Sequence, residues 1–574
     1  MNSSVRRLLV GAGWTLAALA AFAVYLRLAS TRAVNSDGAS IALAAWDMLH
    51  GNVLLRGWRL ADVTFFTTEV PQYALIELAR GLSQDVVQIA AAMTYALVLL
   101  LVALVAKGTA TGRAAAARVA IAVGIMLAPQ LDAGTNVLLS SPDHFGTSVP
   151  LLLILLILDR VRRPRWWVPT LLAALLAWAQ LADSVVLLAG VIPLAVVCAF
   201  RVARSRRPLA AQWYEISLAC AALAGFALAQ IAYRIIPAVG GYTERPLGTG
   251  LAPVSEIFGH NLPIAAQGLL LLPGADVIGR PAGVTTYFVA LHLAGVAVAA
   301  AGIAVAGWRF GRPEGDLVGQ LLLAGIVVNV VAFVVTTHVF FVASAREIAP
   351  ALPFAAALAG RELGPWFCAS PAAASDAGGS DAGRSDAGRS DAGRSDAGRS
   401  DAGRSPGGGP AAGGRRVRRA AAVVLGLVLA GYLAGLGLEL TRPSAPPQAA
   451  ALTAWLESHP LGAGLAGYWE ANVVTLTSGG RVAVRPVTAV GDRIVPTAGQ
   501  VKDDWFDPAR SRVDFVVLFP GIPGYPGFTD RQAVLATFGQ PDRVYRVGPY
   551  TILWWARNLL PDLRSPGTDG PSTG

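Results

Sequence analysis

Residues 86–106 read VVQIAAAMTYALVLLLVALVA, a stretch without a charged side chain that ends directly before Lys107. A helix of ~20 apolar residues crosses the hydrocarbon core of a bilayer, so this stretch predicts a transmembrane helix. Similar runs recur along the chain. Together they lie at residues 8–28, 86–106, 119–138, 146–158, 166–182, 184–200, 214–236, 285–307, 317–337, 349–360 and 420–440. The sequence therefore predicts an all-α polytopic membrane bundle of about eleven transmembrane helices.

The composition excludes a soluble globular protein. Hydrophobic residues make up 54% of the 574 positions, the mean hydropathy is +0.53, and charged residues make up 14%. A soluble chain of this length must cover itself with polar surface, which this composition does not supply. The net charge of +10 does not indicate a nucleic-acid partner, because the arginines cluster in short loops between apolar runs, where they set membrane topology.

Lysine and arginine gather in alternate connections between the runs. These connections include residues 107–118, 160–165, 201–207, 309–312 and 415–419. Since cytoplasmic loops are rich in these residues, we expect a cytoplasmic N-terminus, a first run that is retained as a span, and an extracytoplasmic C-terminal part. Scarce Lys and abundant Ala, Gly and Arg indicate a GC-rich bacterium, and hence a multi-pass protein of the bacterial cytoplasmic membrane.

The segments between the runs divide the chain further. Residues 1–360 are expected to form the transmembrane core, with long outer loops at 29–85 and 237–284. Residues 361–419 hold the repeat SDAGG once and SDAGR five times, which cannot form a core and predicts a disordered cytoplasmic linker. After the span at 420–440, residues 441–561 predict a small α/β domain and 562–574 a disordered tail. Within the domain, helices are expected at 448–458 and 529–538, a helix or strand around 466–477, and strands at 481–487, 513–519 and 543–556.

Ionisable residues collect at the ends of the apolar runs that the arginine count places outside. They are Asp37, Glu69, Asp143, His144, Asp183, Glu244, Arg245, Arg346 and Glu347. A charge at membrane depth costs about 2.5–3.5 kcal/mol or more, so such residues need partners or a water-filled cavity. Their shared side predicts a cavity that opens at the outer leaflet.

One of these residues lies in a stretch that resembles a known family. Asn35-Ser36-Asp37-Gly38 follows the first span, precedes an amphipathic stretch at 39–50, and is followed by GNVLLRGW at 51–58. This loop resembles the first outer loop of the GT-C superfamily, whose members are glycosyltransferases that use polyprenyl-phosphate sugars, such as protein mannosyltransferases and lipid-A aminoarabinose transferases. The resemblance implies a helical membrane core, an acidic residue in that loop, and a C-terminal outer domain. The chain departs from the family in having Gly38, not a second acidic residue, after Asp37.

The chemistry of this transfer requires a base, and the first outer loop offers two carboxylate candidates, Asp37 and Glu69. A base must take the proton of an acceptor hydroxyl as its oxygen attacks the anomeric carbon, and Asp37 suits that role. The alternative for Asp37 is a helix N-cap. Glu69 is a second catalytic candidate, and its alternative is a solvated loop charge.

The remaining candidates would bind the substrate. Arg346 can clamp two oxygens of a lipid phosphate, or pair with Glu347. Arg245 is a further candidate cation. His144 can hydrogen-bond the phosphate or orient the acceptor, unless the backbone satisfies it, and Asp183 either joins the site or caps the next run. No HxxH or CxxC spacing occurs, so the sequence supports neither a metal site nor another cofactor.

The outer domain carries several aromatic residues that can stack on sugars or fill its core. They are Tyr468, Trp469, Trp505 and Trp554–Trp555.

Two classes of function remain open. The first hypothesis is a GT-C-type hexosyl- or pentosyltransferase that contacts membrane lipids and uses a polyprenyl-phosphate sugar as donor. Its acceptor would be an unidentified glycan, protein or lipid. The alternative is a non-enzymatic lipid-linked-sugar flippase, another transporter or a scaffold of envelope assembly. A transporter is expected to show repeated halves and polar residues at mid-membrane, whereas here they gather at one face, which favours the transferase.

Overall fold

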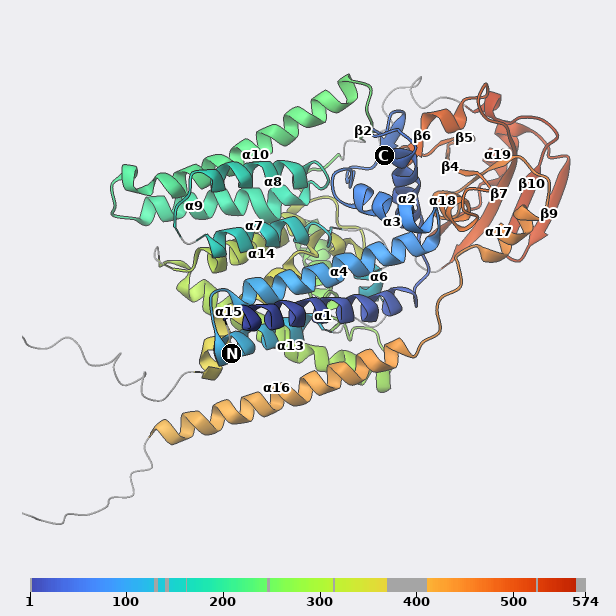
Figure 1. Cartoon of the computed structure of the whole chain (residues 1–574). Helices are drawn as coiled ribbons and strands as arrows, with labels where there is room; N and C mark the ends of the chain where they lie inside the picture. Colours follow the sequence, from blue (N-terminus) through green and yellow to red (C-terminus); the bar gives the residue numbers. More distant parts are fainter. Residues whose placement is uncertain are drawn as a thin grey trace, which may run out of the picture.

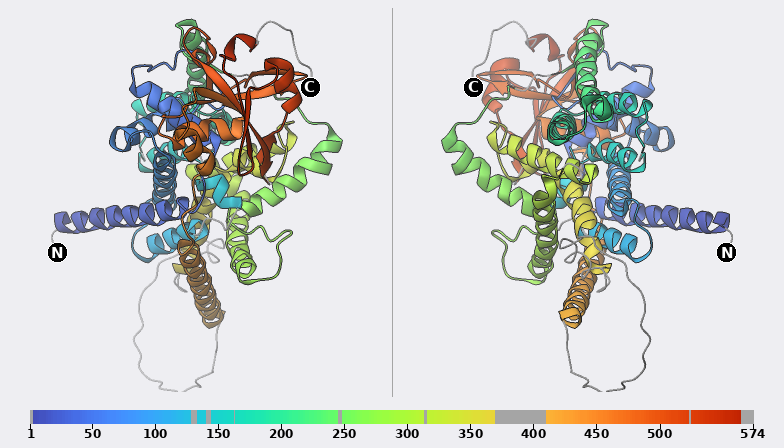
Figure 2. Two further views of the ribbon diagram at one scale, coloured as in Figure 1. Left: turned by 90° about the vertical axis from the view of Figure 1, so that its right-hand side faces the viewer. Right: turned by 90° about the vertical axis from the view of Figure 1, so that its left-hand side faces the viewer.

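The computed structural model describes residues 3–127, 133–139, 144–161, 163–244, 248–312, 315–368, 410–522 and 525–563. It consists of a bundle of long helices with a sheet-containing C-terminal domain at one end (Figure 1). The N-terminal half of the first helix extends away from the bundle, as the turned views show (Figure 2). The SDAGR repeat and the predicted tail after Leu563 lie outside the described residues.

Seven helical segments among the described residues are long and apolar enough to cross a membrane. They confirm a polytopic helical membrane protein. The segments belong to α1 (Ser3–Ala29), α4 (Gln84–Lys107), the π-turn Leu187–Val191 with α9 (Ile192–Arg204), the 3-10 turn Leu209–Gln212 with α10 (Trp213–Ala238), α13 (Val284–Phe310), α14 (Leu317–Val335) and α16 (Pro410–Leu440).

The other four predicted runs form helices that do not meet this length and composition. The run at 119–138 is divided between α5 (Gly112–Met126) and α6 (Ala133–Leu139). The next two form α7 (Ser148–Arg160) and α8 (Trp167–Gln180), and the run at 349–360 forms part of α15 (Ala351–Cys368). Helix α15 continues to Cys368, so residues 361–368 of the linker expected at 361–419 are helical. Gly360, Arg361 and Gly364 are packed inside the bundle.

Helix α15 packs unusually closely against its neighbours. A Cβ atom at Gly360 would lie 2.5 Å from the carbonyl oxygen of Arg118 in α5, and one at Gly364 would lie 3.0 Å from the backbone nitrogen of the same residue. On another side, a Cβ at Gly302 of α13 would lie 2.6 Å from Cα of Ala359. Such glycine contacts let helix backbones approach within a membrane, and here they keep α15 at the centre of the bundle.

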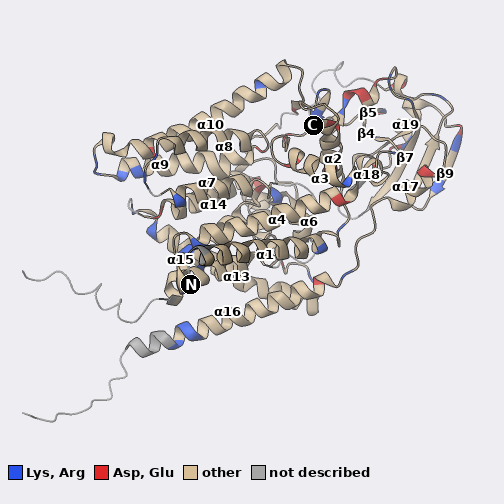
Figure 3. Cartoon of the chain, viewed as in Figure 1, with Lys and Arg blue, Asp and Glu red and all other residues tan. Residues whose placement is uncertain are grey.

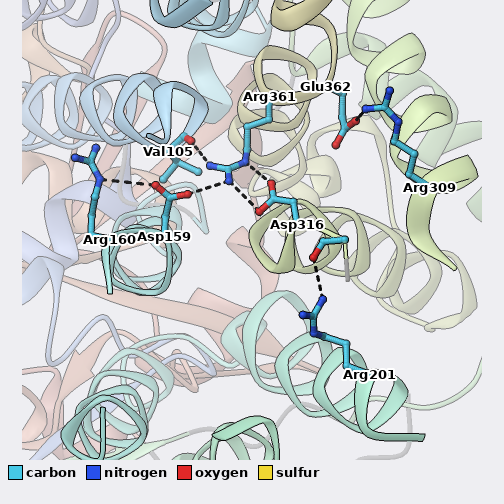
Figure 4. Close-up of polar contacts among 9 residues, drawn as sticks. Val105, Asp159, Arg160, Arg201, Arg309, Asp316, Arg361 and Glu362 are labelled. Carbon is cyan, nitrogen blue, oxygen red and sulfur yellow. Dashed lines mark hydrogen bonds and ion pairs between the residues drawn. The ribbon is translucent and has the colours of Figure 1, made fainter. Parts of the chain in front are cut away.

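A buried arginine on α15 ties together the ends of three other helices (Figure 4). The guanidinium of Arg361 donates to Asp316, the N-cap of α14, at 2.7 Å and to Asp159 near the end of α7 at 2.9 Å. It also donates to the carbonyl of Val105 in α4 at 2.6 Å. Since Arg361 is only 8% exposed, these partners compensate the loss of hydration that its charge suffers. We call Arg361, Asp159 and Asp316 the Arg361 cluster.

The C-terminal domain is a mixed sheet covered by helices. Its strand order is β5-β4-β3-β7-β10-β9, and β8 pairs with β7. Strand β3 (Ala463–Ala466) is parallel to both neighbours, β4 (Val484–Val490) and β7 (Val513–Ile522). The other elements are β5 (Arg493–Pro496), β8 (Tyr525–Phe528), β9 (Arg543–Val547), β10 (Tyr550–Trp554), α17 (Ala450–Glu457), α18 (Tyr468–Thr477) and α19 (Arg531–Phe538). The predicted α/β character of the domain is confirmed.

Two loops of the helical core and the domain share a second, small sheet. Strand β1 (Trp58–Leu60) of the first loop pairs in parallel with β2 (Thr243–Glu244) and antiparallel with β6 (Val501–Lys502) of the domain. Nearby, the ammonium of Lys502 lies 3.0 Å from Asp47 of α2 (Ser36–Leu49). The domain is therefore fixed to the first loop at β1 and at α2; the other helix of this loop is α3 (Glu69–Arg80).

The two ends of the bundle differ in charge, and this difference predicts the topology. Clustered Lys and Arg lie at the helix ends away from the C-terminal domain (Figure 3). With the native cysteines replaced, single cysteines at the exposed positions Arg56, Leu251 and Val490 should react with an impermeant maleimide added to intact cells. Cysteines at the exposed positions Arg113 and Arg206 should react only after permeabilisation. Labelling of the second pair in intact cells would reverse the assigned orientation.

The Arg361 cluster should be a major contributor to stability. Replacing Arg361 by Ala removes the cation that Asp159 and Asp316 share, and the buried Asp159 then keeps only its 3.7 Å contact with Arg160. Removing one partner of a buried ion pair typically destabilises by about 3–5 kcal/mol. We expect a clear fall of the melting temperature of the detergent-solubilised protein. The control is Arg309→Ala, because Arg309 is half-exposed in its 2.7 Å pair with Glu362 and should matter by about 1 kcal/mol or less. Equal melting temperatures for the two variants would contradict a central role of the cluster.

Candidate active site

The first turn of α2 presents Asp37 to the space between the helical bundle and the C-terminal domain. Asn35, not Asp37, is the N-cap, because its side-chain oxygen accepts from the backbone N–H of Gly38 at 3.0 Å. The capping alternative for Asp37 is therefore wrong. Its Oδ1 instead accepts a hydrogen bond from the hydroxyl of Tyr468 at 2.6 Å, and its Oδ2 lies 3.8 Å from Nη1 of Arg346.

Arg346 and Glu347 lie on the short 3-10 turn Val342–Ile348, which directly precedes α15. The Arg346 side chain is 47% exposed, so its charge remains accessible to water and to a ligand. Burial raises the pKa of Glu347, although the charges of His144 and Arg346 oppose this shift. The turn thus brings a cation and a carboxyl from late in the chain to the first loop.

His144 and Asp183 form a buried pair. His144 lies just before α7, and Asp183 lies between α8 and the π-turn Leu187–Val191. Nδ1 of His144 lies 2.9 Å from Oδ2 of Asp183, which also accepts a hydrogen bond from the hydroxyl of Thr147. The other carboxylate oxygen accepts from the backbone N–H of Val185 at 2.9 Å. Burial alone would lower the pKa of His144, but the charge and hydrogen bond of Asp183 outweigh it and raise that pKa to about 9. Burial opposes ionisation of Asp183 as well, whereas His144 and the other donors lower its pKa.

Glu69 begins α3 and is buried rather than solvated, which corrects the loop-charge alternative. Burial raises its pKa to about 7, and the hydroxyl of Thr68, which donates to the carboxylate, acts in the opposite direction. The charges of Asp183 and His144 also act on it. Hydrogen bonds between residues 64–65 and 181–182 hold the two segments together. Glu69 therefore adjoins the His144–Asp183 pair.

Other predicted residues lie elsewhere. Arg245 and Asp143 are outside the described residues. Glu244 belongs to β2, where burial, and then the charge of Asp62, raises its pKa to about 7. Among the aromatic candidates, Trp555 is buried in the domain core, and Trp505 packs against Trp58 at the joint between domain and loop. No group of three or more His, Cys, Asp or Glu side chains that could hold a metal ion occurs within the described ranges.

Comparisons with known proteins show a likeness of fold only. No family model matches the sequence, and no curated protein does. The crystal structure of ArnT from Cupriavidus metallidurans, bound to undecaprenyl phosphate, is similar with a TM-score of 0.50 at 12% identity, covering 96% of this chain and 98% of ArnT. ArnT is a GT-C glycosyltransferase. The chain has the GT-C fold.

The oligosaccharyltransferase of Archaeoglobus fulgidus is less similar. Its apo form gives a TM-score of 0.45 at 13% identity and covers 88% of this chain and 69% of that one. Its complex with zinc and sulfate gives 0.44 at 13% identity, with coverage of 88% and 67%.

Within this GT-C fold, the candidate site is assembled from distant parts of the chain. Asp37, Arg346 and Tyr468 are brought together from the first loop, the turn before α15 and the C-terminal domain. The sequence analysis did not predict the hydrogen bond from Thr147 to Asp183 or the one from Tyr468 to Asp37. No local signal could have shown the second contact, because 431 positions separate its residues.

The His144–Asp183 pair should make stability depend on pH. The folded-state pKa of His144, about 9, exceeds its usual value of ~6.5, so the pair stabilises fully below about pH 6.5 and loses this contribution as the pH rises through 9. At the acid end, the lowered pKa of Asp183 makes the contribution complete only above about pH 4. We expect His144→Phe to lower the melting temperature more at pH 6 than at pH 9.5. Asp183→Asn serves as the matched variant and should show the same trend, and an equal loss at both pH values would contradict the pairing.

Proposed function

We propose that this chain is a membrane glycosyltransferase that moves a sugar from a polyprenyl-phosphate donor to an acceptor on the outer face of the bacterial cytoplasmic membrane. The observation that carries the proposal is a cluster in a GT-C fold: Asp37 lies beside Arg346 and is bonded to Tyr468 of the C-terminal domain, and the charge of Arg346 also acts on the His144–Asp183 pair. The donor class is suggested by ArnT, whose structure contains undecaprenyl phosphate. The arginine pattern supports an extracytoplasmic site and a cytoplasmic N-terminus.

The proposed reaction is a direct displacement at the anomeric carbon. Asp37 takes the proton of an acceptor hydroxyl while the oxygen forms its bond to that carbon. The bond between the anomeric carbon and the phosphate oxygen breaks, and the electron pair leaves with the polyprenyl phosphate. Arg346 stabilises the charge that develops on this leaving group, because a guanidinium can donate two parallel hydrogen bonds to phosphate oxygens.

The contact between Arg346 and Asp37 gives the two residues a shared role. At 3.8 Å it is a loose ion pair, and Arg346 is half-exposed. When a donor phosphate enters, Arg346 is expected to turn towards it, since a doubly bonded phosphate is the stronger partner. This movement leaves the Asp37 carboxylate available to the acceptor.

The other ionisable residues are proposed to orient the substrates. His144, with a pKa of about 9, is cationic near neutral pH and suits the donor phosphate or a sugar hydroxyl. Glu69, with a pKa of about 7, adds a carboxyl that can accept or release a proton in that range. Glu347 and Asp183 hold His144 in place by their charges, and Arg245 is retained as a proposed contact on the second long loop.

The transporter alternative is less well supported. A transporter is expected to place ionisable groups near mid-membrane, between repeated halves. Here Asp37 and Arg346 lie at the end of the bundle that contacts the domain, where Tyr468 bonds to Asp37. This placement favours a reaction at the membrane surface.

Two substitutions test the assigned roles. Asp37→Asn should lower turnover by ~10²–10⁴-fold, the usual effect of losing a general base. Arg346→Ala should mainly raise the apparent KM for the donor, by ~10-fold or more, because a charge-assisted hydrogen bond contributes about 1.5–3 kcal/mol. The assay is sugar transfer from radiolabelled polyprenyl-phosphate donors in proteoliposomes.

The controls are chosen for matching positions. Asp85 also lies in the first turn of a helix but pairs with Arg80 at the surface, and Arg56 is an exposed arginine of the same loop. Asp85→Asn and Arg56→Ala should therefore leave transfer near that of the wild type. Wild-type turnover in Asp37→Asn would remove Asp37 as the base. Absence of transfer by the folded wild type with every common donor would contradict the proposed function.

A further inference from the structure

Tyr468 of the C-terminal domain reaches the candidate site. Tyr468 is the first residue of α18, and its hydroxyl donates to Oδ1 of Asp37 at 2.6 Å. Its backbone carbonyl also accepts a hydrogen bond from the hydroxyl of Ser36. Both ends of Tyr468 thus contact the first turn of α2.

We propose that Tyr468 is a positioning residue, whose hydroxyl holds the Asp37 carboxylate in the orientation required for taking the acceptor proton. The C-terminal domain then completes the transfer site instead of only covering it. This inference rests on the proposed function for its catalytic consequence, but the contact itself is testable without any substrate.

The two oxygens of Asp37 have different partners, and this division explains why Tyr468 is needed. Oδ2 faces Arg346, the residue expected to turn towards the donor phosphate, whereas Oδ1 is held by Tyr468. Once Arg346 turns away, the hydrogen bond from Tyr468 still fixes the carboxylate. Burial and the charge of Asp37 raise the pKa of Tyr468 well above its usual value, so the phenol stays protonated and remains a donor.

The position of Tyr468 is itself fixed by the docking of the domain. Val473 and Leu476 of α18 belong to the same hydrophobic cluster as Ala39 and Ala42 of α2. At the far end of α2, the ion pair between Lys502 and Asp47 holds the domain as well. The residues Asp37 and Asp47 are about 15 Å apart along the helix, so docking and the contact with Asp37 can be disturbed separately.

The first experiment compares three variants of the full-length chain. Tyr468→Phe keeps the ring and removes the hydroxyl, so we expect kcat to fall by ~10–100-fold while the donor KM changes by about 2-fold or less. Tyr545→Phe makes the same deletion on β9, where the ring packs against Trp455, and should leave kcat unchanged. Lys502→Met weakens docking without touching Asp37 and should also leave kcat near that of the wild type. A loss in Lys502→Met as large as in Tyr468→Phe would overturn the proposal, because docking alone would then explain both.

The second experiment does not depend on transfer. The Asp37 side chain is 28% exposed, so a water-soluble carbodiimide with an amine nucleophile can label it, and mass spectrometry can follow the rate. We expect the labelling of Asp37 to accelerate several-fold in Tyr468→Phe but not in Tyr545→Phe or Lys502→Met. An unchanged rate in Tyr468→Phe overturns the positioning role, even if the wild type shows no transfer and the proposed function has failed. Faster labelling with unchanged kcat would also overturn the proposal, because the contact would then exist without assisting the reaction.

Discussion

Helix α15 can occupy the centre of the bundle only because its neighbours approach it more closely than side chains usually permit. Gly360 and Gly364 leave room for the backbone of α5, and the turn between them carries Arg361, whose charge is held by three other helices. Held in this way, α15 has little freedom to slide along its axis. The turn that bears Arg346 directly precedes α15. The position of Arg346 in the site therefore depends on the packing around Arg361, which lies about 15 Å along α15 from its first residue.

The electrostatics of the site suit an anionic ligand better than the number of its acidic residues suggests. Asp183 is neutralised internally by His144, and burial raises the pKa of Glu69 to about 7 and also raises that of Glu347. These shifts reduce the negative charge that an entering phosphate would meet, while Arg346 keeps an accessible cation at the edge. In the proposed reaction, a carboxylate-rich site can therefore admit the donor phosphate because desolvation suppresses part of the site's own charge.

The sequence predicts the membrane bundle and the α/β character of the domain, because hydrophobic runs and turn residues act locally. It gives β9 and β10 as one strand at 543–556 and does not give β5 or β8. It also places Asp37 and Arg346 on the same side of the membrane, since the distribution of loop arginines predicts the topology of the whole chain. The sequence does not decide which residue caps α2, because Asn35 and Asp37 are similarly good caps and only the start of the helix distinguishes them. The burial of Glu69 and the contact of Tyr468 with Asp37 depend on how distant segments dock, which no local pattern records.

The small sheet β2-β1-β6 has a consequence for how this architecture can vary. Three short strands, from two separate loops of the core and from the domain, share their backbone hydrogen bonds, and none is long enough to be stable alone. Backbone pairing tolerates many side chains but not a missing partner. A domain transplanted from another protein would therefore need compatible strands at residues 58–60 and 243–244. The domain and the loops of this chain are accordingly expected to be inherited together as one unit, although they are far apart in sequence.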